Sequence, residues 1–229
     1  MQPQVNAFHI PFADLSPLKS GSFVGSLKEG GPVNCFDIKF NPHGNGTHTE
    51  CVGHISGEHH SVNQCFKDYF MMALVVSVEA GKMGAGSWEQ GDLLIQPNEL
   101  NAAIEKHKFE DCTAIVIRTL PNPESKRTQQ HSGNNSTYFH PDCMDLITEA
   151  GFKHLLTDLP SVDREEDGGA LLAHHLFWNY PENPRLSYTI TELIYVPDHC
   201  VDGIYLLNLQ VAAMESDASP SRPVIYGVI

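Results

Sequence analysis

The sequence predicts one α/β domain over residues 1–229, with a mixed or antiparallel, sheet-dominated core and a few peripheral helices. Of its 229 residues, 41% are hydrophobic, so the chain is long enough to bury a substantial core. Several runs rich in Val, Ile, Tyr and Phe have the length of strands. A strand, helix, strand order is expected from Ala114 to Leu156, and this order is an α/β feature.

Five apolar runs are the expected strands, and together they predict that sheet dominates the core. They cover Val33–Phe40, Tyr69–Val78, Ala114–Leu120, Tyr188–Val196 and Ile204–Met214.

Two helices are expected between these runs. Asn98–Lys106 follows directly after a proline, and Pro141–Ala150 begins with a proline that suits a first helical turn. Gly151 can end the second helix. Residues 154–163 then form an apolar strand that leads into a polar turn. The expected loops, which are polar and lack periodicity, are Pro121–Thr137 and Asp163–Gly169.

Composition argues against several classes of partner. The formal net charge is −14 at pH 7, and only 14 Lys and Arg residues are spread along the chain. Nucleic acids and anionic membrane surfaces need clustered basic residues, so neither is an expected partner. The longest apolar run, about Tyr69 to Val78, is shorter than the roughly 18 to 20 residues of a spanning helix.

The first residues and the cysteines indicate a cytoplasmic location. The N-terminal stretch lacks the basic start and the apolar region of a secretory signal. Six cysteines are scattered without CxxC spacing, and we expect them to be reduced thiols.

A histidine-rich segment is the strongest local signal. Asn41 to His60 holds five of the 13 histidines together with two glutamates. Imidazole nitrogens and carboxylate oxygens are the usual ligands of a catalytic zinc or manganese ion. In an extended chain, His48 and Glu50 project from the same face, and His54 has the same parity, although the chain could bend before it. His43 has the opposite parity, although the glycines after it could form a bulge that re-aims it.

The plainer interpretation is that these histidines belong to a solvated loop. It applies best to His59 and His60, which lie beyond the pattern in a polar context.

The motif GTHTECVGH closely resembles the signature of the cyclase-like metal-dependent hydrolases, which reads H-x-G-T-H-x-D-x-P-x-H. This family includes bacterial kynurenine formamidase and isatin hydrolase. Further segments resemble the family in order along nearly the whole chain, with an irregular middle from about Gly81 to Glu110. They are DLSP, ITEAGFKHLLTDLPSVD, LLAHHLFW, TELIYV and DASPSRPVIYGVI. The resemblance implies a swivelling β/β/α fold, a site with one or two metal ions, and dimers or larger homo-oligomers.

It also implies roles for residues at matching positions. His48 would be a metal ligand, and Glu50 stands where the family has a bridging Asp. His54 matches the histidine that can act as general base beside the metal. His174 matches a later histidine ligand, with His175 as a close competitor. Glu192 matches the later carboxylate, which could bind the metal or orient a ligand histidine.

This chain departs from the family pattern at several positions. The family's first histidine falls on Gly44, and His43 is the nearest substitute. Glu50 replaces Asp and Val52 replaces Pro. The interval between His174 and Glu192 is lengthened by the insertion NYPENPRLS.

These features favour a metal-dependent hydrolase that opens an amide, formamide or cyclic amide of a small molecule. One alternative is a non-catalytic metal- or ligand-binding protein on the same fold. Another is nucleophilic catalysis by Cys51, for which the sequence shows no activating arrangement. Asp163 and the pair Ser219-Pro220 are expected to be turn residues. Aromatic residues that could line a substrate pocket are Phe36, Phe40, Trp88, Tyr138 and Trp178.

Overall fold

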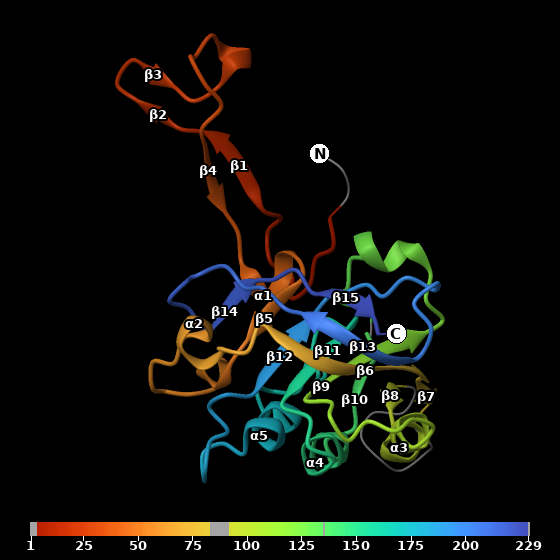
Figure 1. The fold of residues 1–229 in the computed structure, drawn as a ribbon. Helices are drawn as coiled ribbons and strands as arrows, with labels where there is room; N and C mark the ends of the chain where they lie inside the picture. Colours follow the sequence, from red (N-terminus) through yellow and green to blue (C-terminus); the bar gives the residue numbers. More distant parts are fainter. Residues whose placement is uncertain (1–3, 83–91, 135, 229) are drawn as a thin grey trace.

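The computed structural model describes residues 4–82, 92–134 and 136–228. Its body is built on an eight-stranded sheet with the order β14-β5-β12-β11-β9-β6-β13-β15 (Figure 1). In that order the strands are Ala218–Pro220, His48–Glu50, Thr189–Glu192, His154–Thr157, Ala114–Leu120, Phe70–Glu79, Gly203–Asn208 and Val224–Gly227.

The sheet is mixed, as predicted. The four central strands β12, β11, β9 and β6 run parallel to one another. The two outer strands on each side pair antiparallel with their neighbours. Parallel strands are buried on both faces and therefore consist of nearly continuous apolar runs. Strand β9, with the sequence AIVIRTL, is buried along its length except at the final leucine.

Alternate residues of the central strands feed two apolar clusters, one on each face of the sheet. In β6, Leu74 and Val76 belong to the first cluster, while Ala73 and Val75 belong to the second. The helices on the first face are α3 (Pro97–Ile104), α4 (Asp142–Glu149) and α5 (Leu172–Trp178). Of the described helices, only the short α2 (Val62–Cys65) contributes to the second cluster.

Smaller elements complete the body. A three-stranded sheet has the order β10-β8-β7, and α1 stands just before β5. Their bounds are Tyr138–Phe139, Leu93–Ile95, Gly81–Lys82 and Pro42–Asn45. The 3-10 helices are Leu27–Glu29, Val52–His54 and Glu124–Thr128.

A hairpin arm projects away from the body near the N-terminus (Figure 1). Strands β1 and β4 pair with each other, and so do β2 and β3 further out. Their bounds are Asp14–Pro17, Phe36–Lys39, Lys19–Ser20 and Phe23–Val24.

The arm overturns one strand prediction. Val33–Phe40 was expected in the core, but only Phe36–Lys39 forms a strand, and it pairs with β1 outside the main sheet. The reason is local: Cys35 N donates to Gly25 O, and this contact folds the segment back on the arm.

The other elements are confirmed with shifted ends. Tyr69–Val78 and Ala114–Leu120 correspond to β6 and β9, and the two expected helices are α3 and α4. Strands β12 and β13 are shorter than their apolar runs, and a 3-10 helix lies inside the expected loop Pro121–Thr137. None of the helices in the described ranges combines the length and apolar character of a membrane span.

The buried side chain of His154 makes the stability of the folded protein depend on pH. Its side chain is buried in β11, its Nδ1 lies 2.9 Å from Thr189 Oγ1, and burial lowers its pKa to about 4. The folded pKa is below the unfolded value of about 6.5, so the unfolded state binds the extra proton and stability falls as pH drops from about 6.5 towards 4. We expect a loss of roughly 2 kcal/mol between pH 7 and 5 from this residue.

Urea denaturation of the wild type and His154→Gln at both pH values measures this effect. The variant should lose roughly 2 kcal/mol less than the wild type over this interval. If the wild type and the variant lose the same free energy of unfolding, His154 is not a source of the acid sensitivity.

Candidate metal centre

Two neighbouring strands bring the first three side chains together. Antiparallel pairing of β5 with β12 places His48 directly opposite Glu192. His48 Nε2 lies 3.4 Å from Glu192 Oε2 and 4.0 Å from Glu50 Oε2. The predicted same-face arrangement of His48 and Glu50 is therefore present, and all three side chains are buried.

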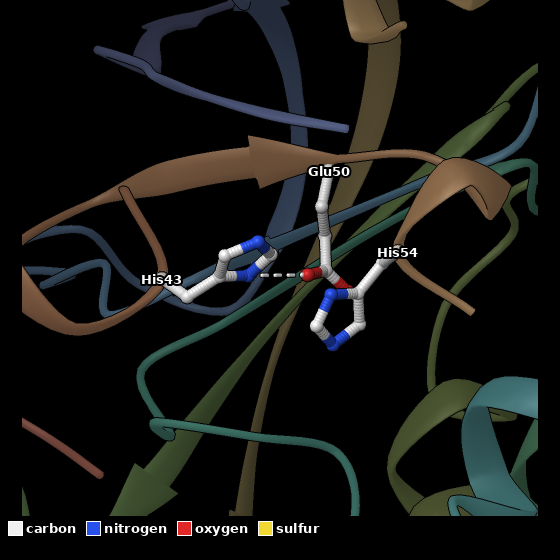
Figure 2. A group of neighbouring side chains, drawn as sticks. All are labelled: His43, Glu50 and His54. Atoms are coloured by element: carbon white, nitrogen blue, oxygen red, sulfur yellow. Dashed lines mark ion pairs between the residues drawn. The ribbon is translucent and has the colours of Figure 1, made fainter. Parts of the chain in front are cut away.

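The helix α1 brings His43 to the same carboxylate. Asn41 caps this helix by accepting a hydrogen bond from Gly44 N, and Pro42 occupies its first turn. His43 Nδ1 lies 3.0 Å from Glu50 Oε2, at an ion-pair distance (Figure 2). A short helix, rather than the proposed bulge, aims this side chain.

The packing around Gly44 disfavours a side chain one position after His43. A Cβ atom on Gly44 would lie 2.7 Å from Ile10 Cδ1 and 3.0 Å from Ala7 O. A histidine at position 44 would therefore clash with the N-terminal segment.

His54 approaches from the 3-10 helix Val52–His54, and Asp217 connects it to His43. The rings of His43 and His54 have their centroids 4.3 Å apart. Asp217 Oδ2 lies 2.9 Å from His43 Nε2 and 3.5 Å from His54 Nδ1. The chain bends after Glu50, so strand parity does not place His54, and the 3-10 helix directs its side chain to the cluster. Asp217 was not predicted.

His174 reaches Glu50 from α5 on the other side. Its Nε2 donates to Glu50 Oε1 at 3.2 Å, and its Nδ1 donates to Asp163 Oδ2 at 2.6 Å. Asp163 also accepts hydrogen bonds from the backbone N–H groups of Ala173 and His174. This residue was expected only to form a turn, but it also orients His174. His175 instead faces Tyr180 O, 2.9 Å from its Nδ1.

The donor set fits a divalent cation. Two groups of three residues share Glu50, and in each group the possible ligand atoms lie within 4.8 Å of one another. The first group is His43, Glu50 and His54, and the second is His48, Glu50 and Glu192. Among the described residues, His48 Nε2 and Glu50 Oε2 are buried without a hydrogen-bond partner. Gly46 O accepts from His48 Nδ1, so Nε2 presents its lone pair to the carboxylates. A cation would satisfy both atoms, because buried polar atoms rarely lack a partner.

Comparison with known proteins places this site in a family. The sequence profile of the family described as putative cyclase matches residues 3–164. The chain belongs to this cyclase family. His174, Glu192 and Asp217 lie beyond the matched region.

Curated relatives agree with this assignment. Kynurenine formamidase from Bacillus anthracis is 29% identical over 123 residues, 53% of each chain. The enzyme of the same name from Bacillus cereus (strain ATCC 10987 / NRS 248) is 33% identical over 105 residues, 43% of this chain and 46% of that one. This chain thus spans about half the length of these curated relatives.

The structural comparisons confirm the fold. A structure described as a novel cyclase has a TM-score of 0.63 at 14% identity, covering 98% of this chain and 84% of the other. Isatin hydrolase A from Labrenzia aggregata, bound to benzyl benzoate, has a TM-score of 0.62 at 12% identity, with coverages of 92% and 81%. At these identities the likeness concerns the fold alone.

The electrostatics of this cyclase-family site favour bound positive charge. Burial opposes protonation of His43, but the adjacent Asp217 and Glu50 carboxylates outweigh it and raise its pKa to about 10. Burial also opposes ionisation of Glu50, and the neighbouring histidines His54, His174 and His43 more than compensate, so its pKa lies well below the usual value. Asp163 and Glu50 likewise raise the pKa of His174 despite its burial. The protons on these histidines supply the positive charge that a divalent ion would otherwise supply to the carboxylates. A metal ion would therefore compete with these protons for the histidine nitrogens.

A cavity of about 470 Å³ adjoins the cluster and has the size of a small-molecule site. His43, His54, His174 and Glu192 line it on one side. Phe8 and Ile10 belong to the apolar part of its wall, and the loop with Glu165, Glu166 and Asp167 closes another side.

The predicted pocket aromatics are mostly elsewhere. Trp178 is buried with its ring 5.5 Å from that of His174, and Tyr138 donates to Asp92 at 2.7 Å. Phe36 is exposed on the arm, and Phe40 is absent from the cavity wall. Trp88 lies outside the described residues.

Cys51 does not have the surroundings of a nucleophile. Its buried Sγ donates to His60 O at 3.6 Å. The contact with Cys65 and burial raise the pKa of the thiol, whereas a nucleophilic cysteine needs a lowered pKa.

Replacing Asp163 should weaken metal binding without removing a ligand. Asp163→Asn removes the charge that holds the His174 ring, and partners of this kind contribute about 10- to 100-fold in metal affinity. Competition with a chromogenic chelator measures the zinc dissociation constant. Asp167→Asn is the matched control, because Asp167 accepts from Gly169 N and Leu171 N and lies in the same loop. Equal zinc affinity in both variants would contradict a positioning role for Asp163.

Proposed function

We propose that this chain is a metal-dependent hydrolase that opens a non-peptide C–N bond in an amide, formamide or cyclic amide of a small molecule. The main support is the buried His48 Nε2, which has no hydrogen-bond partner among the described residues and faces two carboxylates. The matches to kynurenine formamidases provide the chemical class.

The proposed metal ligands come from both groups of donors. His48, Glu50 and Glu192 would hold one ion, and Glu50 could share a second ion with His43 and His54. His174 contacts the other oxygen of Glu50, so we propose it as a further ligand once its Nε2 proton is displaced. Zinc and manganese both suit histidine and carboxylate ligands.

When the ion held by His48, Glu50 and Glu192 is the one bound, proton transfer is the proposed role of His54. A divalent cation supplies Lewis acidity, which makes water acidic near neutral pH and polarises the scissile carbonyl. His54 lines the cavity, and its Nδ1 faces Asp217, which leaves Nε2 on the far side of the ring to accept a proton from water. The same nitrogen can return that proton to the departing amine, as general acid-base catalysis requires.

Two carboxylates would keep the ligands in place. Glu192 Oε1 accepts from Val162 N at 3.1 Å, which fixes the carboxylate with Oε2 towards His48. Glu192 could therefore act as a ligand or orient the ligand histidine. Asp163 fixes the His174 ring through Nδ1, so that Nε2 points at Glu50.

Other features of the proposal rest on the sequence analysis, and the oligomer among them rests on the family resemblance. We propose that residues 1–229 act as one domain, that the protein forms a homodimer or larger homo-oligomer, and that it acts in the cytoplasm. A non-catalytic metal- or ligand-binding protein on the same fold is the alternative, and none of the comparisons supports it.

A substrate panel tests the proposal. The protein, loaded separately with zinc and with manganese, is incubated with aryl formamides, isatin and simple amides, and amine or acid release is followed. Turnover of at least one C–N substrate by the wild type but not by His48→Ala is expected. A metal-loaded protein that hydrolyses none of them would favour the binding-protein alternative.

A further inference from the structure

A second cavity, of about 700 Å³, lies on the sheet face opposite α3, α4 and α5. Its volume is in the range of small-molecule sites. Val116 of β9, Leu156 of β11 and Leu207 of β13 belong to its apolar floor, and all three are buried. Among the described residues, none lines both this cavity and the one at the metal centre. The body therefore has a separate place for a ligand with an apolar part.

Hydrogen bonds to buried groups hold the walls of this cavity in shape. Lys126 Nζ donates to the buried carboxylate of Asp158 at 2.8 Å, which anchors the 3-10 helix that carries Arg127. Asn122 Nδ2 donates to Val196 O at 2.9 Å and holds the wall formed by residues 194–197. A ligand would enter a preformed cavity, so little further ordering of the walls would oppose its binding.

The arginines of the chain point to the charge of that ligand. The chain has five arginines. The guanidinium groups of Arg118 and Arg164 pair with carboxylates, and that of Arg185 donates to two backbone carbonyl groups. Within the described ranges, the guanidinium groups of Arg127 and Arg222 have no hydrogen bond or ion pair, and both residues line this cavity. In a chain of net charge −14, two such cations in one cavity favour an anionic ligand.

Other lining residues agree with an anion bound at the mouth. Arg127 and Arg222 are exposed, in contrast to the buried floor. The Arg127 guanidinium lies 5.8 Å from the centroid of the Tyr195 ring, a contact that limits its freedom. Ser221 also lines the cavity, and its buried Oγ has no hydrogen-bond partner in the described part of the chain. Of the described lining residues, only Glu124 is acidic, so the two arginines leave the lining with net positive charge.

We propose that this cavity binds a small organic carboxylate with an apolar body. The carboxylate group would lie at the mouth beside Arg127 and Arg222, because the fork of a guanidinium group matches the two oxygens of a carboxylate. The apolar body would lie on Val116, Leu156 and Leu207, where its burial removes apolar surface from water. This site goes beyond the proposed hydrolase function and does not depend on the metal.

Isothermal titration calorimetry of the full, metal-loaded chain with decanoate, below the concentration at which it forms micelles, tests this site. Saturable binding of one decanoate per chain is expected. Decanol has the same apolar body without the charge and should bind about tenfold more weakly. Arg127→Gln and Arg222→Gln should each weaken decanoate binding about fivefold, and the double variant about tenfold or more. Lys106→Gln is the matched control, because it removes one charge from an exposed site outside the cavity lining and should bind decanoate like the wild type.

Far-UV circular dichroism and thermal melts establish that each variant is folded. A wild type that does not bind decanoate would overturn the proposal. Equal affinity for decanoate and decanol would also overturn it, because the arginines would then have no role in recognition. Decanoate binding that is unchanged in the double variant would place the anion elsewhere, for example at the metal centre, and would equally overturn it.

Discussion

A Glu50→Gln variant is expected to lose bound divalent metal and about 10³-fold in hydrolytic rate. Glu50 is fully buried, with His43 Nδ1 3.0 Å from one oxygen and His174 Nε2 3.2 Å from the other. An amide is uncharged and a weaker ligand than a carboxylate, so the variant would lose the one residue that both donor groups share. Loss of several kcal/mol of transition-state stabilisation corresponds to about 10³-fold in rate.

Elemental analysis and initial rates on the best panel substrate measure these effects. Glu58→Gln is the matched control, because it makes the same chemical change on an exposed glutamate of the same segment. A folded Glu50→Gln protein that retains metal and rate would show that Glu50 is not the centre of the site.

A His54→Asn variant should keep a metal ion and lose about 10²- to 10⁴-fold in kcat. The group His48, Glu50, Glu192 remains complete without His54, so one ion can still bind. Asparagine cannot accept and return a proton near neutral pH, so the proton transfer assigned to His54 is lost.

This prediction is specific because the His54→Asn variant should lose rate while it keeps its metal. His59→Asn, which changes an exposed histidine five positions later, should leave both unchanged. If His54→Asn instead keeps full kcat with its metal, the proton is transferred by another group.

The part of the site that forms on regular strands was predictable from sequence. His48 and Glu50 are two residues apart on β5, and strand periodicity alone places them on one face. Strand periodicity does not apply where the chain leaves the strand. His43 lies on helix α1, and His54 lies on a 3-10 helix that directs it to the cluster. Their convergence was inferred from clustering and from the family pattern.

What was missed depends on contacts between distant residues. The helix α5 lacks a capping side chain of its own at Leu171, and the N–H groups of its first turn are satisfied by Asp163, eight residues earlier. Local start signals could not reveal such a helix. Asp217 reaches His43 across 174 positions of sequence, and the pairing of β14 with β5 brings it close. It begins the segment DASPSRPVIYGVI, which resembles the family, but the resemblance gave this residue no role. The neighbouring pair Ser219-Pro220 was expected to form a turn, whereas it lies in strand β14.

Divalent metal content of the purified protein, measured by elemental analysis beside a His48→Ala variant, tests the central claim most directly. The account predicts near-stoichiometric zinc or manganese in the wild type and its loss in the variant, because His48 Nε2 is the buried nitrogen that lacks any other partner among the described residues. A wild-type protein that remains metal-free after incubation with both ions would contradict the account.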